Sequence, residues 1–360
     1  MNHQRPIEHT DAALAVDIGG TTLKGAAFDG AGRLVARRTI GTFDINGEAY
    51  SGVLELLRLL RGDALAAGFS LAGIGLASPG LVDIASGTIA FAANLRWENL
   101  PLRDLLEAEF HVPVRVAHDA RTAALAERAA HATESNDAYR HFIFIPIGTG
   151  VSAAVVTSGV LVEGFIGAAG EFGHMPVVPN GDLCSCGQHG CIEAYASATS
   201  IFSRYVRDGG TQATSTREIA GILDTDPLAA QVWNDAVDAL ATGITALTAV
   251  LDPAVIVIGG GLAAAGETLL VPLRARVAER LGWRTTPRIE RSTLTSQGGL
   301  IGAALLAWSD HTLPSTFAAE AHRSLIAEPS ETQAAVTPPG GISPAGVSAA
   351  GLPVPEQTRG

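Results

Sequence analysis

The sequence predicts a two-lobed α/β protein, because the chain is long enough for two domains and repeats one three-strand unit. Its 360 residues correspond to about two domains at the usual ~150 residues each. Residues 14–18 and 141–147 are apolar runs that end in glycines, and each is followed by a second strand, a tight turn and a third strand. The glycine loop and the turn are nine residues apart in both units, which favours a duplicated fold over a single Rossmann sheet.

The remaining elements follow from apolar periodicity and from flanking glycine and proline. In the first half we expect helices over 53–67, 102–110 and 120–130, and strands over 73–77 and 114–117. In the second half we expect helices over 193–206, 235–251 and 267–281, and a buried strand over 254–258. The folded part is expected to end with a helix around 300–308. Residues 329–360 hold six of the 18 prolines, and this composition predicts a disordered tail.

Composition excludes several classes of function. The chain has 24 basic and 36 acidic side chains, and a net charge of −12 argues against nucleic acid as the main partner. Its only lysine, Lys24, does not follow a glycine, so no P-loop is present. The polar start lacks a secretory apolar region, and the longest apolar stretch, 239–251, is too short to span a bilayer. We therefore expect a cytoplasmic protein without a membrane partner.

Two glycine loops, one in each repeated unit, are candidates for binding phosphate. The first reads Asp17-Ile18-Gly19-Gly20-Thr21-Thr22, and the second reads Gly148-Thr149-Gly150. Glycines let backbone N–H groups approach an anion, and threonine hydroxyls add further donors. Asp17, at a strand end, could hold Mg²⁺ through water. Seen alone, such a loop is equally a β-hairpin turn, but two of them favour a nucleotide phosphate site.

A third glycine run, Gly259-Gly260-Gly261, lies between the strand 254–258 and a helix. It matches the dinucleotide pattern G-x-G-x-x-A, as do residues 148–153. Residues 148–153 are followed by a strand rather than the helix that dinucleotide binding requires. The run 259–261 lacks the acidic residue about 20 positions on that would bind a ribose. The run could instead let an adenine ring lie against the backbone. An NAD-linked oxidoreductase remains an alternative that requires dinucleotide binding.

The three cysteines lie within eight residues, at Cys184, Cys186 and Cys191. An odd and tightly clustered set is a poor disulfide framework, whereas glycines between the cysteines allow the sulfurs to converge on a metal. His174 would complete a closed Cys₃His zinc site, and His189 is the local alternative. Four protein ligands leave no open position, so this zinc would be structural. The other interpretation, three free thiols in a loop, would leave them prone to oxidation.

Three carboxylates near these motifs are candidates for binding and catalysis. Glu171 and Glu193 flank the predicted ligands, so a shared zinc would bring them together to bind adjacent hydroxyls of a polyol. Considered as isolated residues, both glutamates can instead be interpreted as solvated surface charges. Asp119 follows the strand 114–117 and precedes a helix. Two compatible interpretations are a helix N-cap and a base that accepts the proton of a substrate hydroxyl during phosphoryl transfer.

Together these motifs resemble the ROK family (repressors, open reading frames and sugar kinases) over residues 14–308. The most specific part is Glu171-Phe172-Gly173-His174 followed by Cys184-x-Cys186-Gly187-x-x-Gly190-Cys191-x-Glu193. The resemblance implies an α/β, two-lobed actin-like ATPase (ribonuclease H-like) fold with an inter-lobe cleft and a structural zinc loop. It implies a small lobe over 12–118, completed by a helix near 300–309, and a large lobe over 119–298 with the zinc loop over 174–193.

The resemblance also implies an activity and a set of roles. The implied reaction is ATP-dependent 6-phosphorylation of glucose or a related hexose, with Mg²⁺, structural Zn²⁺ and a homo-oligomeric (dimeric or tetrameric) state. Asp119 would be the catalytic base. The sugar would be bound by Asn94, His118, Glu171, His174 and Glu193. Zinc would be bound by His174, Cys184, Cys186 and Cys191. ATP would be bound by Asp17, Gly19, Gly20, Thr21, Thr22, Gly148, Thr149 and Gly150 at its phosphates and by Gly259, Gly260 and Gly261 near the adenosine.

One motif departs from the kinase pattern. Kinases of the family usually show Asn-Asp-Ala-Asn where this chain has His118-Asp119-Ala120-Arg121. His-Asp-x-Arg is similar to the family's sugar-sensing repressors, which carry a winged-helix DNA-binding domain ahead of the kinase-like part. Only 16 residues precede Asp17, too few for such a domain, and both phosphate loops are intact. We therefore expect a kinase, with a non-catalytic sugar-sensing protein that lacks a DNA-binding domain as the alternative.

Overall fold

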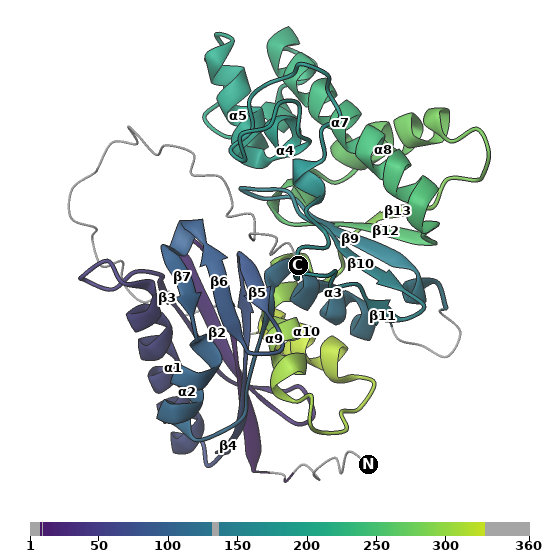
Figure 1. Cartoon of the computed structure of the whole chain (residues 1–360). Coiled ribbons are helices and arrows are strands. Elements are labelled where there is room, and N and C mark those ends of the chain that lie inside the picture. Colours follow the sequence, from purple (N-terminus) through teal and green to yellow (C-terminus); the bar gives the residue numbers. More distant parts are fainter. Residues whose placement is uncertain (1–7, 9, 132–136, 328–360) are drawn as a thin grey trace, which may run out of the picture.

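The computed structural model describes residues 8, 10–131 and 137–327, and these form two lobes, each built on a five-stranded sheet (Figure 1). The strand order is β3-β2-β1-β4-β8 in the first sheet and β11-β10-β9-β12-β13 in the second. In both, three antiparallel strands continue into two parallel ones. The predicted repeat of a three-strand unit is therefore present in both lobes.

The first sheet comprises β1 (Asp11–Ile18), β2 (Thr22–Asp29), β3 (Leu34–Gly41), β4 (Ser70–Ser78) and β8 (Val114–His118). Side chains along β1 alternate between the two faces, as strand geometry requires. Leu14 and Val16 pack toward α1 (Ala49–Ala66) and α2 (Leu102–Phe110). Ala13 and Ala15 pack toward α9 (Gly298–Ala307) and α10 (Phe317–Ala327). Small residues on this second face let α9 approach the sheet closely.

The second sheet comprises β9 (Phe142–Pro146), β10 (Ala154–Thr157), β11 (Val160–Leu161), β12 (Val255–Gly259) and β13 (Arg288–Arg291). Ile143 and Ile145 pack into the core that contains α7 (Pro227–Leu251) and α8 (Glu267–Arg280). Phe142 and Phe144 face the opposite way, toward α3 (Asp119–Ala130). Because α3 also packs on α9, these two helices connect the lobes between the sheets (Figure 1).

A third, smaller sheet was not predicted from the sequence. Its antiparallel strands are β5 (Leu81–Asp83), β6 (Thr88–Ala92) and β7 (Trp97–Leu100). It belongs to the first lobe and extends toward the side of the second lobe that carries α4 (Glu193–Ala196) and α5 (Ala198–Arg207) (Figure 1). The turn η1 (Ala93–Leu95) between β6 and β7 carries Asn94.

The structure corrects two of the predicted helices. The single helix expected over 193–206 is two helices, because Ser197 has extended backbone and caps α5 by accepting a hydrogen bond from the Ser200 N–H. The predicted end of the fold near residue 308 is also wrong, since α10 continues to Ala327. Between α5 and α7 lies α6 (Thr216–Gly221), which was not predicted. The predicted disordered tail, 329–360, lies outside the described residues.

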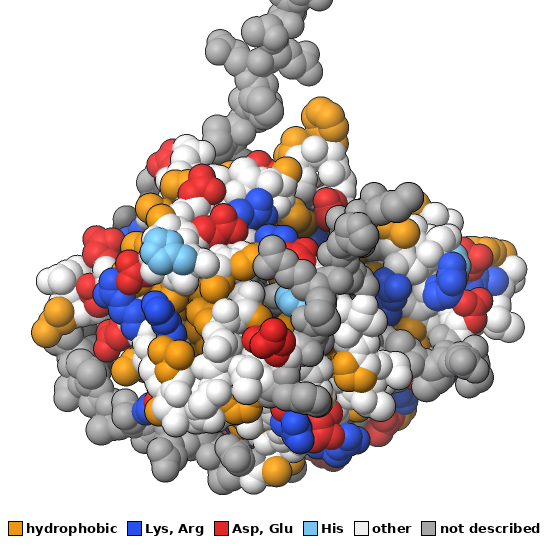
Figure 2. Space-filling model, turned by 90° about the horizontal axis from the view of Figure 1, so that it is seen from below, with side chains coloured by type: hydrophobic (Ala, Val, Ile, Leu, Met, Phe, Trp, Pro, Cys, Tyr) orange, Lys and Arg blue, Asp and Glu red, His pale blue; other side chains and the backbone are white. Residues whose placement is uncertain are grey.

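Charged side chains of both signs are interspersed on the face shown in Figure 2. On the described residues of that face, Lys and Arg do not gather into the single basic field that binding of a phosphate backbone requires. Within the described part of the chain, no helix combines the length and the apolar character needed to cross a bilayer.

Candidate functional site

A cavity of about 810 Å³ lies between the two lobes. The first lobe contributes Gly80 at the end of β4 and Asn94 in η1. The second lobe contributes the second glycine loop, the cysteine segment, the start of α4 and residues along α5 from Thr199 to Arg207. Of the residues predicted to bind sugar, Asn94, His174 and Glu193 line this cavity, whereas His118 and Glu171 are not part of its lining, and neither is the predicted base, Asp119.

The predicted metal ligands converge. One ligand atom from each of His174, Cys184, Cys186 and Cys191 lies within 4.8 Å of the others. The Sγ atoms of Cys186 and Cys191 are 3.7 Å apart, and the Sγ of Cys184 is 3.7 Å from Nδ1 of His174. Zn–S bonds of about 2.3 Å in a tetrahedron place two sulfurs about 3.8 Å apart, so the cluster fits zinc. His189 bonds the Gly181 carbonyl instead, which disfavours it as the fourth ligand.

Burial of the cluster explains why it would take a cation. Desolvation, together with the neighbouring thiols of Cys186 and Cys184, raises the pKa of Cys191 to about 12. Without a metal, the Cys191 thiol therefore keeps its proton. A bound Zn²⁺ would displace the protons and supply the positive charge that three adjacent thiolates require.

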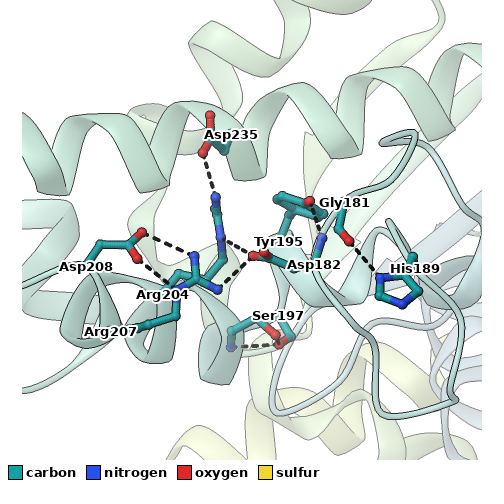
Figure 3. Close-up of polar contacts among 10 residues, drawn as sticks. Gly181, Asp182, His189, Tyr195, Ser197, Arg204, Arg207, Asp208 and Asp235 are labelled. Atoms are coloured by element: carbon teal, nitrogen blue, oxygen red, sulfur yellow. Dashed lines mark hydrogen bonds and ion pairs between the residues drawn. The ribbon is translucent and has the colours of Figure 1, made fainter.

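The metal loop, residues 174–193, is tied to α5 by a network of ion pairs (Figure 3). Arg204 extends from α5 and bonds Asp182 through Nε (3.0 Å) and Asp235 of α7 through Nη2 (2.7 Å). Its guanidinium also lies over the ring of Tyr195, and the hydroxyl of that tyrosine accepts the N–H of Asp182 (2.8 Å). Arg207 adds a second bond to Asp182 (3.1 Å). The loop is thus fixed against a helix that lines the cavity.

Glu193 links the metal loop to the second glycine loop. One carboxylate oxygen accepts the Val151 N–H (2.9 Å), and the other accepts the Ser185 hydroxyl (3.3 Å). A Cβ at Gly150 would lie 2.8 Å from the Glu193 carboxylate, so glycine is required there for this close approach. The sequence predicted both motifs without predicting that they touch.

The second and third glycine runs come together from distant parts of the chain, whereas the first lies beside Asn94. Gly259 accepts the Ile147 N–H (3.0 Å), and the Leu262 N–H bonds the Ile147 carbonyl (3.0 Å), so the third run lies beside the second loop. Gly260 has φ +74°, and a Cβ there would clash with Ile147. In the first lobe, Gly20 lies next to Asn94, whose Nδ2 would be 3.4 Å from an added Cβ.

Asp17 and Asp119 lie at the ends of β1 and β8, on the same edge of the first sheet. Desolvation raises the pKa of Asp17 to about 6 against the opposing charge of Lys24, and the charge of Asp119 adds a smaller contribution in the same direction as desolvation. The start of α9 is equally close, since a Cβ on Gly299 would lie 2.9 Å from the Asp17 carboxyl. Two carboxylates at the same edge of a sheet suit a divalent cation.

Asp119 is the first residue of α3, and the N-cap position belongs to His118, which makes no side-chain cap. The simple N-cap interpretation of Asp119 is therefore wrong. Its carboxylate bonds the adjacent Ala120 N–H (2.5 Å) and lies 3.3 Å from Nδ1 of His118. Its side chain is 44% exposed, whereas His118 is largely buried. An exposed carboxylate at this position is accessible to a substrate hydroxyl and can accept its proton.

Several cavity-lining residues escaped the sequence analysis. Gly80 follows β4 with φ +90°, and a Cβ there would clash with the Phe91 carbonyl. The Ser78-Pro79-Gly80 run at the end of a buried strand is the sequence signal for this turn. Hydroxyl side chains of α5 also face the cavity, and their spacing of three to four residues is the signal for one helix face.

Comparison with known proteins identifies relatives along most of the chain. The model of the ROK family matches residues 13–310. A glucokinase from Halalkalibacterium halodurans is 34% identical over 319 residues, which cover 81% of this chain and 94% of that protein. A xylose repressor from Caldicellulosiruptor bescii is 28% identical over 254 residues, 66% of this chain and 63% of that protein. A Streptomyces griseus ROK family glucokinase, solved with glucose and AMPPNP, superposes with a TM-score of 0.69 at 29% identity, covering 83% of this chain and 99% of that chain.

Proposed function

Because this chain belongs to the ROK family, we propose that it is an ATP-dependent sugar kinase that phosphorylates the 6-hydroxyl of glucose or a related hexose. Relatives named glucokinase, and a similar glucokinase solved with glucose and AMPPNP, support a sugar kinase. The observation that carries the proposal is the inter-lobe cavity, in which Asn94, His174 and Glu193 meet the second glycine loop.

The sugar would be bound between the metal loop and the first lobe. Nδ1 of His174 faces the cysteine sulfurs, while its Nε2 lies 3.8 Å from the Glu171 carboxylate. Zinc would therefore leave Nε2 available to a sugar hydroxyl, with Glu171 and Glu193 as acceptors for adjacent hydroxyls. Bound zinc fixes the imidazole and the loop in place. Asn94 would bind the sugar from the opposite lobe, and His118 would bind it beside Asp119.

The phosphates of ATP would lie between the two glycine loops. Backbone N–H groups of Gly20 and Gly150, with the hydroxyls of Thr21, Thr22 and Thr149, would surround them, and residues 259–261 would lie near the adenosine. Gly19 shapes the first loop, because its N–H closes the turn on the Thr22 carbonyl (3.0 Å). Asp17 would hold Mg²⁺, which neutralises phosphate charge when bound. Gly148 completes the second loop.

Asp119 is proposed as the base. Its carboxylate would accept the proton of the 6-hydroxyl as that oxygen bonds the γ-phosphorus and the bond from phosphorus to the ADP oxygen breaks. Closure of the lobes would exclude water and align the two reacting oxygens. A cytoplasmic location and a homo-oligomeric state are further predictions from the sequence.

The test is a coupled ADP-release assay over a panel of hexoses and N-acetylhexosamines. With the best substrate, Asp119→Asn should lower kcat by about 10²–10⁴-fold, the usual contribution of a general base, while sugar binding persists. Asp104→Asn is the matched control, because Asp104 occupies the first turn of α2 away from the cavity. Turnover unchanged in Asp119→Asn would remove Asp119 from the mechanism.

The second candidate is a non-catalytic sugar-sensing protein. His118 and Arg121, which depart from the kinase pattern, and the similarity to a xylose repressor favour it. This candidate predicts that a sugar raises the melting temperature while no hexose yields ADP. Rapid turnover of any panel sugar would exclude it.

A further inference from the structure

Arg121 is a buried cation beside the proposed base. It lies two residues after Asp119 on α3, and only 2% of it is exposed. Its Nη2 donates to the carbonyls of Gly167 and, at 3.4 Å, Ala169. Its Nε and Nη1 are buried without a hydrogen-bond partner in the described part of the chain. Burying a guanidinium with two unpaired donors is costly, so this arrangement requires an explanation.

The carbonyls that Arg121 binds belong to residues 163–170, which we call the 163–170 loop. Glycines at positions 164, 167 and 170 have φ of +79°, +75° and +101°, so this backbone has unusual freedom. The Ala169 N–H closes the loop on the Glu163 carbonyl (3.2 Å). Phe165, at its tip, is fully exposed. The bonds from Arg121 thus fix the loop from the α3 side, in addition to the Ala153 N–H, which donates to the Gly170 carbonyl (2.7 Å) at its C-terminal end.

The next residue along the chain is Glu171, a proposed sugar ligand. The charges of Glu163, Glu171 and Asp119 all act on Arg121 and oppose the lowering of its pKa by desolvation. The guanidinium is thus within electrostatic range of three carboxylates, two of which belong to the proposed site. The same loop abuts the first lobe, because a Cβ on Gly167 would lie 3.1 Å from the Val82 carbonyl of β5.

We propose that Arg121 is a positioning residue that holds the 163–170 loop, and with it Glu171, against the first turn of α3 that carries Asp119. It acts through these neighbours rather than on the substrate. Its unpaired Nε and Nη1 provide donors for the Glu171 carboxylate when sugar binding draws the two walls together. This inference rests on the proposed sugar site. It also explains why an arginine at position 121, where kinases of the family usually have asparagine, matters: the shorter asparagine side chain could not reach the carbonyls of the 163–170 loop.

The experiment compares Arg121→Met with Arg128→Met. Arg128 lies two turns further along α3 and donates in the same way to the carbonyl of Gly159, in the β10–β11 turn away from the cavity. With the best panel sugar, Arg121→Met should raise the sugar KM at least tenfold and leave the ATP KM within about twofold. Arg121→Lys should restore part of the sugar affinity, and Arg128→Met should keep both KM values. An unchanged sugar KM, or equal effects of both methionine variants, would overturn the proposal.

A second readout does not depend on activity. Chymotrypsin cleavage after Phe165 should be several-fold faster in Arg121→Met than in the wild type or in Arg128→Met. If no sugar is turned over, the proposed function fails, but unchanged cleavage would still overturn the role of Arg121 and faster cleavage would support it. If Arg121→Met does not fold, Arg121→Lys replaces it, and a wild-type cleavage rate and sugar KM in that variant count against the proposal.

Discussion

Replacing Asp17 with asparagine should stabilise the protein while abolishing its proposed activity. Desolvation raises the pKa of Asp17 from 3.8 to about 6, so the folded protein favours the protonated carboxyl. The protonated carboxyl therefore contributes to the free energy of unfolding. This contribution is fully present below the pKa of Asp17 in the unfolded chain and is lost as the pH rises through its pKa in the folded protein. At 1.36 kcal/mol per pKa unit, ionised Asp17 costs the folded state up to about 3 kcal/mol at pH 7.5.

Asparagine is neutral at every pH and therefore escapes this cost. The gain of Asp17→Asn over the wild type should be near zero at pH 4 and reach its full value above about pH 7. At about 2 °C per kcal/mol, the full gain in stability corresponds to a rise of roughly 6 °C in Tm. Turnover should be lost because a neutral amide binds Mg²⁺ poorly. Such a trade between stability and activity is common at functional sites.

The assay is thermal unfolding without nucleotide or added Mg²⁺ at pH 4.5, 6.0 and 7.5. Asp29→Asn is the matched control, because Asp29 is a buried aspartate at the end of β2 whose carboxylate accepts the N–H groups of Ala31 and Arg33 (2.9 Å each) and Nε of Arg33 (2.8 Å). That variant should lower Tm. The reasoning is refuted if Asp17→Asn lowers Tm at pH 7.5, or if its effect on Tm is the same at all three values.

Two further predictions concern the metal and the packing between sheet and helix. Metal analysis should find about one zinc per chain, and Cys186→Ser should release it, lower Tm and raise the sugar KM; wild-type protein that is metal-free and fully active would contradict this. Gly75→Ala would place a Cβ 1.9 Å from the Ala303 carbonyl of α9, so overpacking should cost about 1–3 kcal/mol or more, whereas Gly62→Ala in α1 has open space and should be neutral or stabilising. Equal melting temperatures of the two alanine variants would show that α9 does not pack tightly on β4.

His118 and Arg121 are the residues at which a kinase and a sugar-sensing protein are hardest to tell apart. Both residues flank Asp119, and neither belongs to the pattern usual in the kinases. The structure gives them different environments: His118 contacts the proposed base, whereas Arg121 reaches across to the 163–170 loop. A kinase with altered sugar preference and a sensor that only binds sugar would both use these contacts, and the ADP-release assay separates them.

The sequence by itself determined the parts of this protein that depend on neighbouring residues. The β1–β2 and β9–β10 loops follow from glycines placed between apolar strands. The metal cluster follows from three cysteines within eight residues, since ligands so close along the chain converge with little backbone rearrangement. The helix over 102–110 was predicted with its observed bounds, because its apolar spacing and the preceding proline are local signals.

Only the tertiary structure decided which of these parts touch. Asp17 and Asp119 are about a hundred residues apart in sequence and meet because the order β1-β4-β8 brings two strand ends to one edge. Glu193 joins the metal loop to the glycine loop, and Arg121 joins α3 to the 163–170 loop, through single side-chain contacts that leave no periodic pattern. The helix α10 also depends on long-range packing, because it lies against α3 and α9. Local propensity and spacing set the elements, whereas burial of surfaces distant in sequence sets their arrangement.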